Sequence, residues 1–350
     1  MIFFRQIGLC IAAFMFISGC VSTELGVQSS SAGSDNRRNL QEEYTSAFPT
    51  KDISANISNV FRSVRRITIS GIYRIFYFEE EPVTLPQIRG ADLMQLSSRS
   101  TTKEESVAGT AISIAQDSRF ISLLTCAHIV QFPDTLIEYV ETGDLPENEY
   151  IRSVAVKFTQ HNLVYGERHL APFEVKSVDP VKDLALIQVQ RQQEPNLQIP
   201  PLSIQLGNSK DLKWGSFLYI AGYPRGRAVV TRAIVSDPNR TSRGDFLTDG
   251  LFNQGMSGGI ILASRDHYSS FEWVGMTNTA SAEEEHILVP APNRSTSDKL
   301  TEPYDGPVYQ EKKVRIAYGV TQSIPTGDIA DFLDENRQLL QASAVSFPSF

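Results

Sequence analysis

Cysteine is scarce in this sequence of 350 residues, which contains three. Cys10 and Cys20 lie near the N-terminus, so Cys126 is alone in the body of the chain. A single thiol cannot form an intrachain disulfide bond, which excludes a disulfide framework for the body of the protein. Stability must therefore come from a hydrophobic core, and the 41% of hydrophobic residues are enough to build one.

Positive charge is also in deficit, with 32 Lys and Arg residues against 40 Asp and Glu, a formal net charge of −8. The longest runs of Lys and Arg are two residues. Tracking a phosphate backbone requires clustered cationic side chains. The sequence therefore predicts no nucleic-acid partner.

Signals for metals and cofactors are missing as well. The five histidines include four that stand in polar surroundings without the spacing of metal ligands: His161, His169, His267 and His286. No HExxH, CxxC or phosphate-binding glycine loop occurs. We therefore expect no metal site and no cofactor.

No apolar run is long enough to span a bilayer. Residues 7–17 form an apolar or small run of eleven residues behind Arg5, well short of the roughly 20 that a spanning helix needs. Such a run is typical of the core of a signal peptide. This segment ends in Ile17-Ser18-Gly19-Cys20, which resembles the lipobox of bacterial lipoproteins.

The lipobox resemblance implies that residues 1–19 are removed and that Cys20 carries the lipid, including palmitate, that anchors the protein to a membrane. Val21 follows in place of the Asp that signals retention in the inner membrane. The resemblance therefore implies a bacterial cell envelope location, at the outer membrane facing the periplasm. The alternative is a plain secretory signal with an incidental cysteine.

The rest of the chain has two compositions. Residues 20–58 are rich in Ser, Asn, Gln and Gly, and are predicted to be a flexible tether of roughly 30–35 Å. Residues 59–342 contain many short β-rich runs separated by turns, which predicts an all-β barrel or sandwich domain. Within it, residues 79–106 and 281–313 are expected to be long loops, and residues 326–336 a helix. Residues 343–350 are expected to be a C-terminal tail.

Three short segments carry chemistry. They centre on His128, directly after an apolar strand, on Asp183, and on Ser257 in a glycine-rich turn. A serine hydroxyl is a weak nucleophile until a base such as imidazole removes its proton. A carboxylate must then hold the imidazole in the correct tautomer. The sequence therefore predicts a His128–Asp183–Ser257 catalytic triad.

The turn around Ser257 also suits an oxyanion hole. Gly255 permits a backbone conformation that aims amide groups at a developing negative charge, together with the amide of Ser257. Gly258 and Gly259 leave room for a substrate backbone. Asp179 is the alternative carboxylate, but its place beside Pro180 favours a turn.

The three segments resemble those of trypsin-like serine proteases, and most of all the HtrA (Deg) branch. The last segment carries the match at Thr248, Asp249, Asn253, Gly255, Ser257, Gly258 and Gly259. The resemblance covers about residues 60–340. It implies a trypsin-like double β-barrel, two six-stranded barrels with the triad in the cleft between them and a C-terminal helix. No PDZ domain is expected after that helix.

The sequence departs from the HtrA pattern at several points. The interval from His128 to Asp183 spans 55 positions, longer than usual, so residues 131–150 are expected to include an inserted loop. Cys126 replaces a small apolar residue and is expected to be a buried filler rather than a second nucleophile. Met256 stands where the family has Asn or Asp, which argues against activation by N-terminal clipping.

Specificity is inferred from the resemblance. Leu251 falls where the family lines the base of the S1 pocket, which implies an aliphatic P1 residue; the alternative is that Leu251 belongs to the barrel core. Met276 and Thr277 are expected to line the opposite wall of the substrate site. The segment 281–313 follows them and is expected to form a lid.

These observations predict a serine endopeptidase that hydrolyses peptide bonds of envelope proteins, with protein or peptide substrates as its partners. Two alternatives stay open. One is a catalytically silent or latent lipoprotein that uses the protease fold as a binding adaptor. The other is an esterase using the same triad, against which the absence of a G-x-S-x-G elbow on an α/β pattern counts.

Overall fold

The chain divides into two units, Met1–Gln41 and Glu42–Phe350. The computed structural model describes residues 43–79, 83–140, 150–167, 169–290 and 308–340, all in the second unit, and for residues 279–290 and 308–319 it describes the backbone. The predicted signal peptide and Cys20 lie outside the described residues. No helix among the described residues has the length and apolar character needed to cross a membrane.

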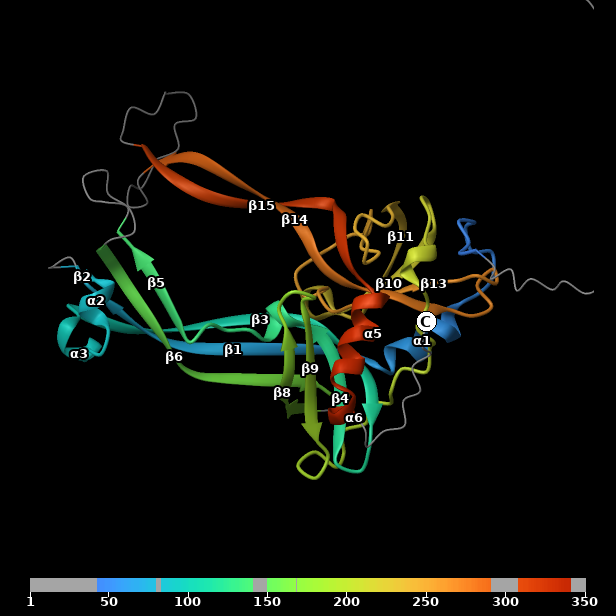
Figure 1. The fold of residues 1–350 in the computed structure, drawn as a ribbon, viewed down its shortest axis with the longest axis horizontal. Helices are drawn as coiled ribbons and strands as arrows, with labels where there is room; N and C mark the ends of the chain where they lie inside the picture. Colours follow the sequence, from blue (N-terminus) through green and yellow to red (C-terminus); the bar gives the residue numbers. More distant parts are fainter. Residues whose placement is uncertain (1–42, 80–82, 141–149, 168, 291–307, 341–350) are drawn as a thin grey trace, which may run out of the picture. The chain divides into compact units, whose positions relative to one another are not determined.

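The first lobe is a curled antiparallel sheet of nine strands, ordered β2-β6-β1-β3-β4-β9-β8, with β5 and β7 paired to β6 (Figure 1). Its strands are β1 (Val64–Tyr77), β2 (Val83–Thr84), β3 (Arg99–Gln116), β4 (Phe120–Cys126), β5 (Thr135–Tyr139), β6 (Tyr150–Tyr165), β7 (Leu170–Pro172), β8 (Glu174–Asp179) and β9 (Leu184–Gln190). This lobe contributes β4, which ends two residues before His128, and β9, which begins directly after Asp183.

The second lobe is a closed barrel of six strands, ordered β10-β11-β12-β15-β14-β13. Its strands are β10 (Phe217–Gly222), β11 (Val229–Asp237), β12 (Phe246–Thr248), β13 (Ile260–Ala263), β14 (Glu272–Pro290) and β15 (Val308–Pro325). The predicted all-β class with two β lobes is confirmed, although the first lobe has nine strands rather than six.

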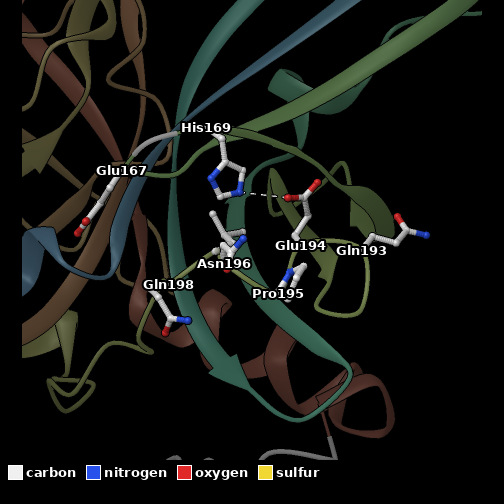
Figure 2. A pocket seen from close by; sticks show the side chains of 8 residues that line it. Glu167, His169, Gln193, Glu194, Pro195, Asn196 and Gln198 are labelled. Atoms are coloured by element: carbon white, nitrogen blue, oxygen red, sulfur yellow. Dashed lines mark hydrogen bonds and ion pairs between the residues drawn. The ribbon is translucent and has the colours of Figure 1, made fainter.

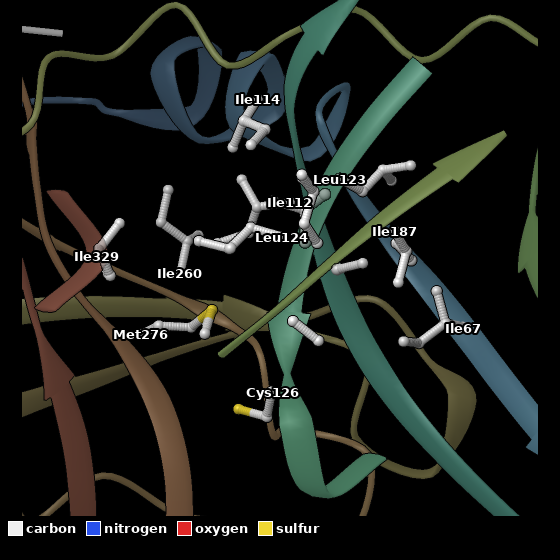
Figure 3. Packing of buried hydrophobic residues seen from close by; sticks show 14 of the residues in the cluster. Ile67, Ile112, Ile114, Leu123, Leu124, Cys126, Ile187, Ile260, Met276 and Ile329 are labelled. Carbon is white, nitrogen blue, oxygen red and sulfur yellow. The ribbon is translucent and has the colours of Figure 1, made fainter. Parts of the chain in front are cut away.

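Buried apolar side chains join the two lobes. In β4 and β9 nearly every residue is buried, because both faces of these strands are covered. Their core continues into the second lobe, so that Ile112 and Leu124 lie near Ile260 and Met276 (Figure 3). A separate cluster that includes Phe246 fills the barrel of the second lobe. The segments that carry the predicted triad residues therefore adjoin a hydrophobic core that the two lobes share.

The far ends of β1, β3 and β6 extend beyond the main hydrophobic core and have a small hydrophobic core of their own. There a third cluster forms from Phe76, Phe78, Val83, Ile151 and Val154. The short helices α2 (Leu85–Ile88) and α3 (Leu93–Leu96) and strand β5 cover this cluster (Figure 1). We call this part of the first lobe, residues 71–79, 83–108, 134–140 and 150–160, the arm.

The arm corrects the expectation of a long loop over residues 79–106. That prediction is wrong for residues 99–106, which belong to β3, and for the two short helices before them. Its high content of polar residues reflects the exposed start of β3. The inserted segment after His128 supplies β5 to the arm, and its residues 141–149 lie outside the described part.

The long hairpin of β14 and β15 corrects the second expected loop. Residues 281–290 and 308–313 belong to these two strands, and residues 282–290 pair with 308–316 in antiparallel register, from Ala282 opposite Ile316 to Pro290 opposite Val308. The prediction of a loop is therefore wrong for these residues, and residues 291–307 lie outside the description. The lid expected over residues 281–313 is described here only as the backbone of this hairpin.

Three helices lie near the ends of the described chain. Helix α5 (Thr326–Glu335) follows Pro325 as predicted and buries Ile329, Phe332 and Leu333 against the core. Helix α6 (Arg337–Leu340) continues it. Helix α1 (Ser54–Phe61) precedes the first strand.

Part of the predicted tether packs on the second lobe. The Thr45 amide donates to the carbonyl of Ser264 at 2.9 Å, and the Thr45 carbonyl accepts from the Phe217 amide at 3.0 Å. Tyr44 is buried and its hydroxyl donates to Glu272 at 2.5 Å. Residues from Glu43 onward are thus held against the domain.

Candidate active site

The first lobe holds the predicted base. Strand β4 ends at Cys126, and the single-turn helix α4 (Ala127–Val130) carries His128 immediately after it. His128 makes two bonds to Asp183: its amide donates to Oδ1 at 2.8 Å, and its Nδ1 lies 2.7 Å from Oδ2. Because a carboxylate only accepts, Nδ1 carries the proton and Nε2 is left as the basic nitrogen.

Asp183 is itself fixed by the turn between β8 and β9. Its backbone adopts φ 54°, a left-handed conformation that Asp tolerates better than most residues. Its carbonyl accepts from the Ala127 amide at 3.1 Å. The preceding Lys182 forms ion pairs with Asp179 at 3.2 Å and with Glu335 of α5 at 2.7 Å. The C-terminal helix therefore helps to hold the carboxylate turn in place.

Asp179 has a different role from Asp183. Its Oδ1 accepts from the amides of Val181 and Lys182 at 2.9 and 3.0 Å, which closes a turn around Pro180. The hydrogen bond from the Lys182 amide holds the pKa of Asp179 below its usual range, against the effect of partial burial. The geometry brings His128 to Asp183 and leaves Asp179 in the turn.

The second lobe supplies Ser257 on a turn between β12 and β13. Ser257 is 8% exposed, and its Oγ donates to the carbonyl of Asn278 at 2.9 Å. Within the described residues, no hydrogen bond joins Ser257 to His128. The serine therefore faces the β14 strand in this conformation.

Two amides in this turn are free to receive a negative charge. Among the described residues, neither the Gly255 amide nor the Ser257 amide donates to a protein acceptor. Gly255 adopts φ 97°, and an added Cβ there would lie 2.6 Å from the Tyr223 carbonyl oxygen. Glycine is thus required at this position by both conformation and space. This pair of amides has the character of an oxyanion hole.

The carbonyls on the opposite side of these peptides are all occupied. Gln254 accepts from the Arg225 amide at 2.8 Å, and Met256 accepts from Thr277 Oγ1 at 2.6 Å. Because the carbonyl and amide of a trans peptide point in opposite directions, these bonds turn the amides of Gly255 and Ser257 away from Arg225 and Thr277. The Met256 side chain is buried in the barrel core.

The residues expected to bind substrate lie in two environments. Leu251 is 63% exposed, so it stands outside the barrel core. Met276 and Thr277 are fully buried; Met276 packs in the shared core, and the Thr277 hydroxyl is bonded within the Ser257 turn. The side chains of these two residues therefore support the turn from behind.

Cys126 is fully buried at the end of β4 (Figure 3). Its thiol donates to the Thr277 carbonyl at 3.4 Å, and burial raises its pKa well above the usual range. Its sulfur and the ligand atoms of His128 and Asp183 lie within 4.8 Å of one another, a donor set that suits Zn²⁺. However, Nδ1 and the carboxylate already bond to each other, and the thiol already donates to the Thr277 carbonyl.

Among the described residues, the linings of two further hollows include none of the three predicted triad residues. One has a volume of about 690 Å³ and is lined by residues that include Glu167, His169 and Glu194, with His169 Nε2 3.1 Å from Glu194 (Figure 2). The other, of about 840 Å³, begins at Val130, two residues after His128. Sequence reasoning singled out neither hollow, because each is assembled from segments far apart in the chain.

Comparison with known proteins agrees with this geometry. Residues 109–269, which include all three predicted triad residues, match the model of the trypsin-like peptidase domain. This match supports a trypsin-like serine protease. No curated protein matches the sequence significantly.

Among solved structures, the chain is similar to the Rv3671c protease of M. tuberculosis. In its active form that protease is 16% identical, with a TM-score of 0.43, 93% of this chain and 97% of that chain being covered. Its inactive form gives the same identity and TM-score, with 83% of this chain and 97% of that chain covered.

Proposed function

We propose that this protein is a serine endopeptidase that uses His128, Asp183 and Ser257. One observation carries the proposal. The first lobe contributes a histidine whose Nδ1 lies 2.7 Å from the Asp183 carboxylate, and the second lobe contributes a serine turn in which the amides of Gly255 and Ser257 have no acceptor among the described residues. A base held in one tautomer, a nucleophile and free donors are the components that acyl transfer requires.

The reaction begins when the Ser257 hydroxyl leaves the Asn278 carbonyl and turns to Nε2 of His128. The imidazole takes the hydroxyl proton while Oγ bonds to the scissile carbonyl carbon, whose oxygen becomes negative between the Gly255 and Ser257 amides. Asp183 stabilises the imidazolium. His128 then protonates the amine as the C–N bond breaks. It next takes a proton from the water that attacks the acyl-enzyme and returns a proton to Ser257 Oγ as the carboxylic acid leaves.

Hydrolysis of fluorescently labelled casein by the full chain tests this activity, with Ser257→Ala as the matched control. We expect cleavage by the wild type and none by the variant. Equal cleavage by both proteins would show that another group or a contaminant is responsible. No cleavage by either would favour the adaptor described below.

The resemblance to the HtrA branch further suggests an aliphatic P1 residue. Leu251 precedes the nucleophile by six residues and is exposed, which leaves its side chain available to a substrate. Leu251→Asp would place a carboxylate there, and we expect the preference in a peptide library to move toward Lys and Arg at P1. An unchanged profile would exclude Leu251 from the pocket.

The lipobox resemblance suggests envelope proteins as substrates and a membrane anchor on Cys20. Incorporation of labelled palmitate into the wild type, but not into Cys20→Ser, is the expected result. Equal incorporation into both would contradict the anchor at Cys20. Fractionation of the envelope would then locate the protein at the inner or outer membrane.

A latent or silent adaptor is the second candidate function. The bond from Ser257 Oγ to Asn278 favours it, because the nucleophile in this conformation is engaged away from its base. Labelling with a fluorophosphonate, with and without envelope extract, separates the two states. Labelling that requires extract indicates a latent enzyme, whereas no labelling in either condition indicates an adaptor.

A further inference from the structure

A buried threonine of the first lobe reaches into the serine turn of the second. Thr110 lies in β3 and is fully buried. Its hydroxyl donates to the Gly255 carbonyl at 2.8 Å and accepts from the Tyr223 amide at 2.9 Å. Its own amide donates to the Ser257 carbonyl at 2.8 Å. Three hydrogen bonds therefore run from this one residue to the other lobe.

Thr110 acts on the peptide between the two free amides. The Gly255 carbonyl bonds to Thr110 Oγ1, while the amide of the same peptide, on Met256, donates to Asn253 at 2.9 Å. A peptide held at both ends cannot flip without losing two buried hydrogen bonds. Such a flip would change the direction of the neighbouring amides, including that of Gly255.

The Thr110 backbone adds a steric constraint. At Gly258, which has φ 83°, an added Cβ would lie 2.0 Å from the Thr110 carbonyl oxygen. That oxygen is itself held by Thr125 Oγ1 at 2.7 Å. The serine turn therefore packs directly against β3, whose backbone at Thr110 is held by a hydrogen bond from β4.

We propose that Thr110 is a positioning residue for the oxyanion hole, holding the Gly255–Met256 peptide so that the amides of Gly255 and Ser257 stay aimed at the substrate. This proposal rests on the proposed function. In this proposal Thr110 orders the turn in place of an acidic side chain at position 256, because the Met256 side chain packs in the apolar barrel core.

Three variants test the proposal. Thr110→Val removes the hydroxyl and keeps the shape, and Thr110→Ser keeps the hydroxyl. The matched control is Thr321→Val, since Thr321 is a buried threonine of the second lobe whose hydroxyl also donates to a glycine carbonyl, that of Gly250, at 2.8 Å.

The first readout does not depend on catalysis. Amide hydrogen exchange is measured by mass spectrometry on peptides covering residues 253–259. We expect faster exchange in Thr110→Val, and the wild-type rate in Thr110→Ser and Thr321→Val. Unchanged exchange in Thr110→Val would overturn the role of Thr110 in holding the turn, whether or not the protein is an enzyme.

The second readout is the rate at which a fluorophosphonate labels Ser257. We expect it to fall about 10- to 100-fold in Thr110→Val, less than the roughly 10²–10³ for losing an oxyanion donor outright. Thr110→Ser should restore it to within about threefold, with an unchanged pH profile, because His128 is not affected. Full-rate labelling of Thr110→Val overturns the proposal, whereas a wild-type chain that never labels contradicts the proposed function instead.

Discussion

The two lobes contribute to the candidate site in different ways. In the first lobe, His128 and Asp183 are joined by two hydrogen bonds, and the Asp183 carbonyl accepts from the amide of Ala127, the first residue of α4; α5 adds an ion pair from Glu335 to Lys182. The second lobe holds Ser257 on a turn whose carbonyls depend partly on outside groups. Thr110 of the first lobe supplies two of those contacts.

Because of this difference, the position of the His128 imidazole and the direction of the oxyanion-hole amides depend on different parts of the molecule. The bonds between His128 and Asp183 lie within one lobe, so a change at the contact between Thr110 and the serine turn should leave them intact. The oxyanion hole is a property of the contact between lobes. Substitutions in the His128–Asp183 pair and substitutions in the serine turn should therefore lower activity by different amounts and disturb different parts of the site.

Removal of the nucleophile has the largest expected effect. Ser257→Ala should lower kcat by about 10⁶ and leave the fold intact, because the lost hydroxyl makes one hydrogen bond, to Asn278. Turnover of a peptide substrate and the midpoint of thermal unfolding check both parts. A loss of unfolding stability large enough to explain the lost activity would contradict a catalytic role.

The carboxylate of the first lobe comes next. Asp183→Asn should lower kcat by roughly 10⁴, because an amide can donate to Nδ1 and so favour the wrong tautomer of His128. Hydrogen exchange around residues 253–259 should stay at the wild-type rate, since the second lobe is untouched. Faster exchange there would break the separation between the lobes.

Gly255 tests the turn itself. Gly255→Ala should lower kcat by roughly 10²–10³, because its Cβ would lie 2.6 Å from the Tyr223 carbonyl and force the oxyanion amide aside. Gly215→Ala is the control: Gly215 also has a positive φ, 78°, but no heavy atom lies within 4 Å of its added Cβ. Equal losses of kcat in both variants would mean that backbone strain alone is responsible.

Asp179 gives the smallest expected effect. Asp179→Asn keeps an oxygen for the amides of Val181 and Lys182 but loses the ion pair with Lys182, so unfolding should cost about 0.5 kcal/mol less at neutral pH. The depressed pKa of Asp179 stabilises the fold above the usual Asp pKa and ceases to do so as pH falls through its folded value. Chemical denaturation at two pH values should show the difference at pH 7 and none in strong acid.

Much of the candidate site could be predicted from the sequence because its motifs are local. The histidine after an apolar strand, the Asp before another and the glycine-rich serine turn each place one group at a strand end. Helix α5 was equally predictable, since Pro325 and the spacing of Ile329, Phe332 and Leu333 are signals within one segment.

What could not be predicted depends on contacts between distant segments. Thr110 looks like an ordinary strand residue in the sequence, and its importance arises from Gly255, 145 positions away. The start of β3 looked like a loop because its exposed residues are polar, and the arm core that supports it combines Phe76 with Ile151. Similarly, Met276 and Thr277 face inward, which no local pattern indicates.

The most direct test of the account is fluorophosphonate labelling of the full chain beside its Ser257→Ala and Asp183→Asn variants. An activated serine predicts strong labelling of the wild type, labelling slowed by orders of magnitude in Asp183→Asn, and none in Ser257→Ala. Labelling of Asp183→Asn at the wild-type rate, or of Ser257→Ala at all, would contradict a serine activated by the His128–Asp183 pair.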